Sequence, residues 1–341
     1  MTGIAIIGCG QWGPNHIRNF QLQPGAKVIS AVDADPARLD RVRSLFPAVE
    51  CYQEFAKTLT DDRVNAIVIA TPLSTHYPLV RDALNAGKHV LCEKPLTETT
   101  SQARELVDLA KKQNVILMTG HVFLFNPGII KVKELVDKGD AGRLYYLSAV
   151  RTNLGPIRQD CNAAFDLATH DVSIFNWIMG SEPTEVSATG ASFLRPGVED
   201  VVSISLKYPN EVFAMIEASW LNPKKVRQIT VVGSQQMITW DDLQLGAPVT
   251  CYDKHADISK DYNDYGEFLR VSTWEGDVRL PRVTAEEPLK LQGRYFLDAI
   301  ARGSIETSGG EFSLGVVRVL QAIAGSLKMN GRPVELARGT L

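Results

Sequence analysis

Apolar runs and helical patterns alternate through the first third of the chain. Short apolar runs, rich in β-branched residues, predict buried strands at residues 4–7, 27–32, 66–70, 88–92 and 115–119. Between them, apolar residues recur at helical spacing over residues 36–46, 75–86 and 97–113. Because such strands separated by helices form parallel sheets covered on both faces, the pattern predicts an α/β fold with a doubly wound parallel sheet.

The pattern changes after about Phe125. A helix is predicted over residues 129–137, and strand-like runs then dominate, at residues 144–152, 184–194, 200–208, 212–220, 226–232 and 236–241. Short turns join neighbouring runs, which favours a largely antiparallel sheet, interrupted by a helix over residues 163–179. Residues 246–287 are polar and predict an irregular excursion with one edge strand, before two final helices. We expect two domains, residues 1–125 and 126–341.

A glycine-rich turn follows the first predicted strand. Its spacing matches the fingerprint that binds a dinucleotide pyrophosphate at a helix N-terminus, with residues Gly8, Gly10, Gln11, Trp12 and Gly13. An ordinary glycine loop could share this spacing. The second predicted strand, however, ends in Asp33, about 20 residues past the last glycine, where a ribose-binding carboxylate is expected.

Asp33 also bears on the choice of cofactor. A carboxylate there accepts hydrogen bonds from the ribose hydroxyls and repels a 2′-phosphate, so the sequence favours NAD over NADP. Arg38 is expected to lie too far along the chain to hold a 2′-phosphate.

Composition narrows the possible partners. The 341 residues carry a formal net charge of −3, which gives no basic footprint for nucleic acid. The five cysteines are scattered and suggest neither a disulfide framework nor a zinc site, as in a cytoplasmic protein with reduced thiols. We expect no membrane span, no signal peptide and no bound metal.

Candidate chemistry gathers where parallel strands end. Ligands of such sheets bind at the carboxyl ends of the strands, which places Asp33, Thr71-Pro72, Glu93-Lys94-Pro95 and Gly120-His121 along one edge. A lone lysine is usually a solvated charge. Directly after a buried strand and beside a nicotinamide, Lys94 could instead hydrogen-bond a substrate hydroxyl or carbonyl and take part in proton transfer.

A second candidate lies on the predicted helix over residues 163–179. Asp166 and His170 are four residues apart and share one helix face. The pair could be an ordinary surface contact. As a general acid and base, His170 would move the proton of a reacting hydroxyl, helped by Asp166 or Lys94.

A third cluster contains possible anion ligands. Arg151 and Asn153 point the same way on an alternating strand, and Arg158, Asp160 and Asn162 follow. Arginine binds phosphate or carboxylate through two parallel hydrogen bonds. Taken alone, salt bridges on a sheet surface explain these residues better, but a substrate anion becomes plausible beside Asp166 and His170.

Together these motifs make the chain resemble the Gfo/Idh/MocA (glucose–fructose oxidoreductase / inositol dehydrogenase) family. The resemblance rests on four segments in order: Gly8–Gly13, Ala70-Thr71-Pro72 with His76, Glu93-Lys94-Pro95-Leu96, and Asp166 with His170. It implies a Rossmann domain and an α+β domain with a large open, mostly antiparallel sheet through which subunits associate as a homodimer or homotetramer. It further implies cofactor contacts from Thr71, Pro72, His76, Glu93 and Lys94.

The resemblance also implies a reaction. Members transfer a hydride between a nicotinamide cofactor and a ring carbon of a sugar or cyclitol, with Lys94 and His170 as the catalytic pair and Asp166 in support. Residues 151–160 look like a branch of nucleotide-sugar 3-dehydrogenases, acting on substrates such as UDP-N-acetylglucosamine, whose diphosphate would give Arg151 or Arg158 a purpose. Two differences from many relatives, Ala163–Phe165 and Ser173, leave the substrate open. The alternatives are a keto-sugar reductase, an inositol or other polyol dehydrogenase, and a non-catalytic NAD-binding sensor.

Overall fold

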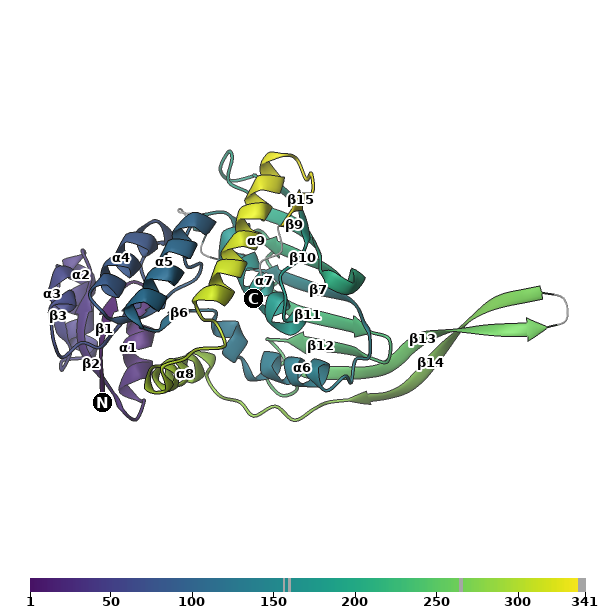
Figure 1. The fold of residues 1–341 in the computed structure, drawn as a ribbon, viewed down its shortest axis with the longest axis horizontal. Helices are drawn as coiled ribbons and strands as arrows, with labels where there is room; N and C mark the ends of the chain where they lie inside the picture. Colours follow the sequence, from purple (N-terminus) through teal and green to yellow (C-terminus); the bar gives the residue numbers. More distant parts are fainter. Residues whose placement is uncertain (156, 159–160, 264–265, 337–341) are drawn as a thin grey trace. The chain divides into compact units, whose positions relative to one another are not determined.

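The computed structural model describes residues 1–155, 157–158, 161–263 and 266–336, with the backbone alone for residues 257–263 and 266–272 (Figure 1). The described chain forms two compact units. One contains residues 1–125 and 286–321, and the other contains residues 126–285 and 322–336. Each unit has its own sheet.

The first unit is built on a six-stranded parallel sheet, as predicted. Its order is β3-β2-β1-β4-β5-β6, from strands β1 (Thr2–Ile7), β2 (Ala26–Val32), β3 (Glu50–Tyr52), β4 (Ala66–Ile69), β5 (His89–Cys92) and β6 (Leu117–Thr119). The order reverses between β1 and β4, which makes this the point where ligands of doubly wound sheets bind. Both strands are almost entirely buried, which explains their continuous apolar sequences.

Helices cover both faces of this sheet (Figure 1). They are α1 (Gly13–Gln21), α2 (Pro36–Leu45), α3 (Ala56–Leu59), α4 (Leu73–Asn85), α5 (Thr100–Gln113), the 3-10 turn η1 (Val122–Phe125), α8 (Pro288–Arg302) and the first part of α9 (Gly310–Lys328). Helices α4 and α5 lie side by side, and α8 packs against α1 and η1.

The position of α8 corrects the expected extent of the second domain, residues 126–341. Residues 286–321 belong to the first unit, because the apolar face of α8 is buried there. A Cβ on Gly293 would lie 3.4 Å from the ring of Phe20 in α1, so the two helices meet closely. At one end of this contact Arg18 pairs with Glu287 at 2.5 Å.

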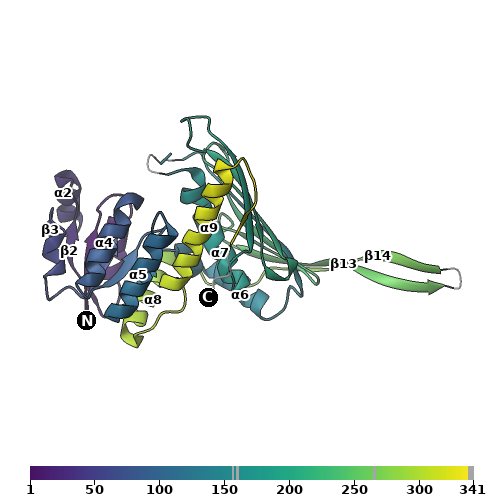
Figure 2. The ribbon, with the colours of Figure 1, turned by 45° about the horizontal axis from the view of Figure 1, so that its top comes forward.

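The second unit contains a nine-stranded sheet in the order β14-β13-β12-β11-β7-β10-β9-β8-β15. Its strands are β7 (Leu144–Thr152), β8 (Glu185–Ala191), β9 (Val201–Lys207), β10 (Phe213–Ser219), β11 (Val226–Gly233), β12 (Met237–Asp241), β13 (Val249–Asn263), β14 (Gly266–Arg279) and β15 (Val334–Glu335). The pairing is antiparallel apart from β7 with β10, which agrees with the predicted mostly antiparallel sheet. Helices α6 (Pro127–Asp137) and α7 (Thr169–Met179) lie on one face (Figure 2).

For residues 246–287 the predicted irregular excursion was wrong, whereas the predicted edge strand is present, because β14 lies at the edge of the sheet. In place of an irregular excursion, β13 and β14 form a long antiparallel hairpin, and only residues 249–252 of β13 pair with β12. The rest of the hairpin extends beyond the sheet as a two-stranded ribbon (Figures 1 and 2). Polar and apolar residues follow one another along it without a clear alternation, so periodicity gave no strand pattern.

Candidate active site

The glycine turn after β1 is closely fitted to its surroundings. Gly8 has φ +93°, and a Cβ there would lie 2.5 Å from the carbonyl oxygen of Ala70. A Cβ on Gly13 would lie 2.0 Å from the carbonyl oxygen of Gly8, so this position allows α1 to approach the strand. Gly10 differs, since its Cβ would meet nothing nearer than Arg38 at 3.7 Å. The middle glycine thus leaves space over the turn, as the approach of a pyrophosphate requires.

The N-terminus of α1 suits an anion. Its N-cap residue, Trp12, makes no side-chain cap hydrogen bond, and Pro14 occupies the first turn. Gln11 and Trp12 are exposed at the turn, and Gln11 accepts a hydrogen bond from the side chain of Asn15 at 3.0 Å through its carbonyl oxygen. Uncapped N–H groups and the positive end of the helix dipole are what a dinucleotide pyrophosphate binds. These residues therefore fit the cofactor that the sequence predicts.

Asp33 is fixed at the end of β2 beside this turn. Its Oδ2 accepts a hydrogen bond from the backbone of Cys9 at 2.7 Å, and its Oδ1 accepts one from the backbone of Asp35 at 2.9 Å. Burial and the neighbouring Asp33 carboxylate raise the pKa of the Cys9 thiol to about 12. Arg38 corrects our expectation, because its guanidinium lies 3.5 Å from Asp33 Oδ2. A helix that begins directly after Asp35 returns Arg38 to the strand end, which distance along the chain could not reveal.

Glu93, directly after β5, forms a hydrogen bond with a histidine of α1. Nε2 of His16 lies 2.9 Å from Oε1 of Glu93. Burial alone raises the pKa of Glu93, but the hydrogen bond to His16 and the charges of His16 and Lys94 outweigh it, so the pKa lies below its ordinary value. The carboxylate before Lys94 is therefore ionised and oriented. Sequence reasoning missed His16, since a histidine within the first helix carries no signal of its own.

His76 joins two of the predicted segments. It lies in α4 and is 1% exposed, with Nδ1 2.8 Å from the carbonyl oxygen of Pro95 and Nε2 2.9 Å from that of Thr71. Pro95 follows Lys94 through a cis peptide bond. The ring thus ties the end of β4 to the segment after β5. The contact of His76 with the cofactor that the resemblance implies stays a prediction, and the geometry shows that its ring contacts the backbone of both segments.

Asp166 lies in a π-helical turn of the second unit. Residues Ala164–Ala168 form this turn directly before α7, where a continuous α-helix was expected. Oδ2 of Asp166 accepts a hydrogen bond from the indole of Trp220 at 3.1 Å, and Nη1 of Arg158 lies 3.6 Å from its Oδ1. His170 follows within the first turn of α7. Single π-helical turns within helices are frequent at functional sites because they re-aim side chains.

Arg151 forms a buried salt bridge with Asp171. Its Nε and Nη2 donate hydrogen bonds to the two carboxylate oxygens of Asp171 at 2.8 and 2.7 Å, and the side chains are 4% and 1% exposed. The substrate role expected for Arg151 is therefore revised to that of a buried salt bridge between β7 and α7. Asn153 is half-buried just beyond β7, with its backbone N–H bonded to Ser219. Asp160, the further member of the expected cluster, lies outside the described residues.

Two family models match this chain. Residues 2–121 match the model described as an oxidoreductase family with an NAD-binding Rossmann fold, and residues 129–239 match the Gfo/Idh/MocA C-terminal domain. The chain belongs to the Gfo/Idh/MocA family. Its first unit is the NAD-binding Rossmann domain, and the cofactor is NAD.

Individual relatives agree with this assignment. The uncharacterized oxidoreductase YrbE of Bacillus subtilis is 29% identical over 63% of this chain and 66% of its own length. Myo-inositol 2-dehydrogenase of Thermotoga maritima is 27% identical over 63% of this chain and 68% of its own length. The matches thus span about two thirds of the curated relatives.

Solved structures share the fold over nearly the whole chain. GenD2 from gentamicin A biosynthesis, in complex with NAD, has a TM-score of 0.82 at 24% identity and covers 98% of this chain and 96% of its own. UDP-N-acetylglucosamine 3-dehydrogenase GnnA from Acidithiobacillus ferrooxidans has a TM-score of 0.81 at 21% identity and covers 96% and 98%. At these identities the likeness concerns the fold.

His121 is a further residue at the strand ends of this Gfo/Idh/MocA protein. It follows Gly120 after β6, is almost fully buried, and packs edge-on against Phe312 at 5.8 Å. Within the described chain, neither ring nitrogen has a hydrogen-bond partner. Burial and the charge of Lys94 lower the pKa of His121 to about 3, so the ring is neutral. Its place after β6 was visible in the sequence, but its burial was not.

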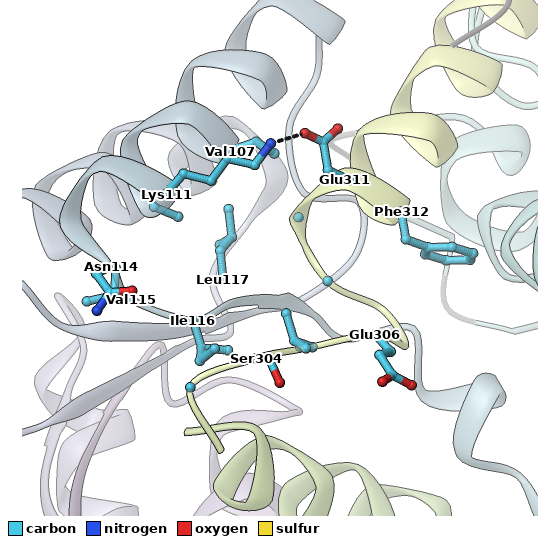
Figure 3. Close-up of a pocket in the computed structure, with 15 residues that line it drawn as sticks. Val107, Lys111, Asn114, Val115, Ile116, Leu117, Ser304, Glu306, Glu311 and Phe312 are labelled. Carbon is cyan, nitrogen blue, oxygen red and sulfur yellow. Dashed lines mark hydrogen bonds and ion pairs between the residues drawn. The ribbon is translucent and has the colours of Figure 1, made fainter. Parts of the chain in front are cut away.

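A separate cavity of about 360 Å³ lies in the same unit (Figure 3). It is lined by the second half of α5, the residues leading into β6 and the segment between α8 and α9. Lys111 and Glu311 pair at 2.5 Å beside it. Leu117, which begins β6, lines this cavity, so the cavity lies toward the amino end of that strand. None of the predicted site residues lines it.

The described residues contain neither a candidate membrane span nor a candidate metal cluster. No helix in them is both long and apolar enough to cross a membrane. Within the same residues, no three histidine, cysteine or acidic side chains are grouped to hold a metal ion.

Proposed function

We propose that this protein is an NAD-dependent dehydrogenase that oxidises a ring hydroxyl of a sugar or other cyclic polyol. The observation that carries the proposal is the double support of the Glu93-Lys94-Pro95 segment, from His16 on one side and His76 on the other, at the edge where a dinucleotide fits. Inositol dehydrogenase activity in the names of several relatives supports the polyol class.

The reaction divides between a hydride and a proton. When bound, NAD accepts the hydride from the carbinol carbon. Lys94 hydrogen-bonds the reacting hydroxyl, and His170 receives its proton as general base, a common role of histidine in catalysis. Asp166, oriented by Trp220 and Arg158, supports His170. In the reverse direction the same groups return the proton, so a keto-sugar reductase would use the same residues.

Within this class we favour a nucleotide sugar oxidised at C3. Arg158 supports this, since its side chain is 32% exposed and its guanidinium lies near Asp166, where it could meet a diphosphate. Arg151 suits this purpose less well, because its Nε and Nη2 already donate hydrogen bonds to Asp171. Inositol is the second candidate, favoured by the relatives' names.

We also propose self-association through the uncovered face of the nine-stranded sheet. Tyr146 on β7 and Phe213 on β10 are register partners, and both are partly exposed beside Met215. Large exposed apolar patches of this kind mark interfaces. A sedimentation measurement of the wild type and of Met215→Lys would test this, with dissociation expected in the variant.

A substrate panel tests the reaction. Purified protein with NAD is offered UDP-N-acetylglucosamine, free sugars, and myo- and scyllo-inositol, while nicotinamide absorbance is followed. We expect turnover with the nucleotide sugar, and Arg158→Ala should raise its KM without raising that of inositol. Turnover with inositols alone would select the second candidate. Absence of turnover with every compound, together with an NAD-dependent protein interaction, would favour a sensor.

A further inference from the structure

Each ring nitrogen of His76 lies within hydrogen-bond distance of a backbone carbonyl oxygen, so in both contacts only the ring can be the donor. Both partners of its ring nitrogens, the carbonyl oxygens of Pro95 and Thr71, can only accept. A neutral imidazole has one N–H and one lone pair, so it can satisfy one of these contacts, while its lone pair would face the other oxygen at under 3 Å. Only the doubly protonated ring donates to both.

Burial of His76 makes it costly for the neutral ring to leave one of these hydrogen bonds unmade. His76 is 1% exposed, and both its contacts are buried or partly buried, so water cannot replace a missing hydrogen bond. Charge-assisted hydrogen bonds are also about twice as strong as neutral ones.

We propose that His76 is held as an imidazolium, and that it is a positioning residue which fixes the strand ends bearing Thr71 and Pro95. Lys94 directly precedes Pro95, so the hydrogen bond from His76 to Pro95 fixes the backbone that carries the proposed catalytic lysine. It also places a permanent positive charge in the NAD-binding domain, at its ligand edge.

This charge has a consequence for the cofactor. The oxidised nicotinamide ring is positively charged and the reduced ring is neutral. A fixed cation in the same domain therefore weakens binding of NAD⁺ relative to NADH. Removing the charge should lower the ratio of the NAD⁺ and NADH dissociation constants, by about threefold or more if the effective dielectric is near that of a protein surface.

The protonation state can be read directly. Wild-type protein with ¹⁵N-labelled histidine is examined by NMR at about pH 8, where an ordinary histidine is neutral because its pKa is about 6.5. Signals of His76 are assigned through ring-to-backbone correlations. We expect both ring nitrogens to be protonated. A lone-pair nitrogen in His76 would overturn the proposal, and this result needs no variant to fold.

Binding provides the second readout. Dissociation constants of NAD⁺ and NADH are measured for the wild type, His76→Asn and His76→Gln, which can keep one carbonyl contact each but carry no charge. Arg104→Ala is the matched control, since it removes a positive charge from an exposed pair with Glu311 in the same unit. We expect the ratio to fall in both His76 variants and to stay unchanged in the control. An unchanged ratio in folded His76 variants would contradict the proposal, whatever substrate the enzyme proves to use.

Discussion

Nε2 of His16 lies 2.9 Å from Oε1 of Glu93, 77 residues away in the sequence. The same helix begins at the glycine turn, and the same carboxylate precedes Lys94. The segment that fits the cofactor is thus joined by one partly buried hydrogen bond to the segment proposed for catalysis. A substitution in either segment should therefore change the position of side chains in the other.

Replacing His16 with Phe keeps a ring but leaves the Glu93 carboxylate without this partner. We expect a loss of about 1–3 kcal/mol in the free energy of unfolding, measured by urea denaturation at neutral pH. Folding lowers the Glu93 pKa, so its contribution is complete above its ordinary value of 4.5 and is lost as the pH falls below it. Arg18→Ala, which breaks an exposed pair on the same helix, should cost under about 1 kcal/mol. Equal losses in the two variants would contradict this account.

His121 should make the protein sensitive to acid. Its pKa is about 3 in the folded protein, against 6.5 for an unperturbed histidine. As the pH falls from 6.5 toward 3, the unfolded chain takes up a proton that the folded protein does not, so stability is lost over that range. His121→Phe removes this contribution, and between those limits its free energy of unfolding should fall less steeply with acid, by about 1.4 kcal/mol per pH unit. Parallel stability curves for the two proteins would show that His121 is not buried as a neutral ring.

Asp33 and Arg38 should together set the preference for NAD. Asp33→Ser removes the carboxylate that repels a 2′-phosphate and leaves Arg38 beside the ribose position. We expect the ratio of NADPH to NADH dissociation constants, from fluorescence titration, to fall by about tenfold or more. Adding Arg38→Ala should reverse most of that gain. If the wild type already binds NADPH more tightly than NADH, the role given to Asp33 is wrong.

The buried pair of Arg151 and Asp171 should matter for folding. Arg151→Met leaves Asp171 as an uncompensated buried charge, which typically costs about 3–5 kcal/mol. The double variant with Asp171→Leu removes both charges and should recover much of that loss, as chemical denaturation would show. A variant of Arg151 with normal stability and a raised substrate KM would instead restore the substrate role first expected from the sequence.

Arg151 shows which features of the site could be predicted from the sequence and which could not. Alternation along a strand predicted the β7 position of Arg151, but its partner, Asp171, lies 20 residues away on a helix. Strand ends could be predicted because apolar runs stop at Asp33, Thr71 and Glu93. Contacts such as that of His16 with Glu93 depend on packing between distant elements, which no local pattern encodes. The β13–β14 hairpin was missed because its sequence shows no clear period-2 apolar pattern.

The proposed catalytic pair is tested most directly by separating turnover from cofactor binding. Lys94→Met and His170→Ala are compared with wild type for kcat on the best substrate of the panel and for the NADH dissociation constant. We predict that kcat falls by about 10²–10⁴-fold in each variant, the usual contribution of a general acid or base, while NADH binding changes little. A kcat near that of the wild type in either folded variant would exclude that residue from the chemistry and contradict the account.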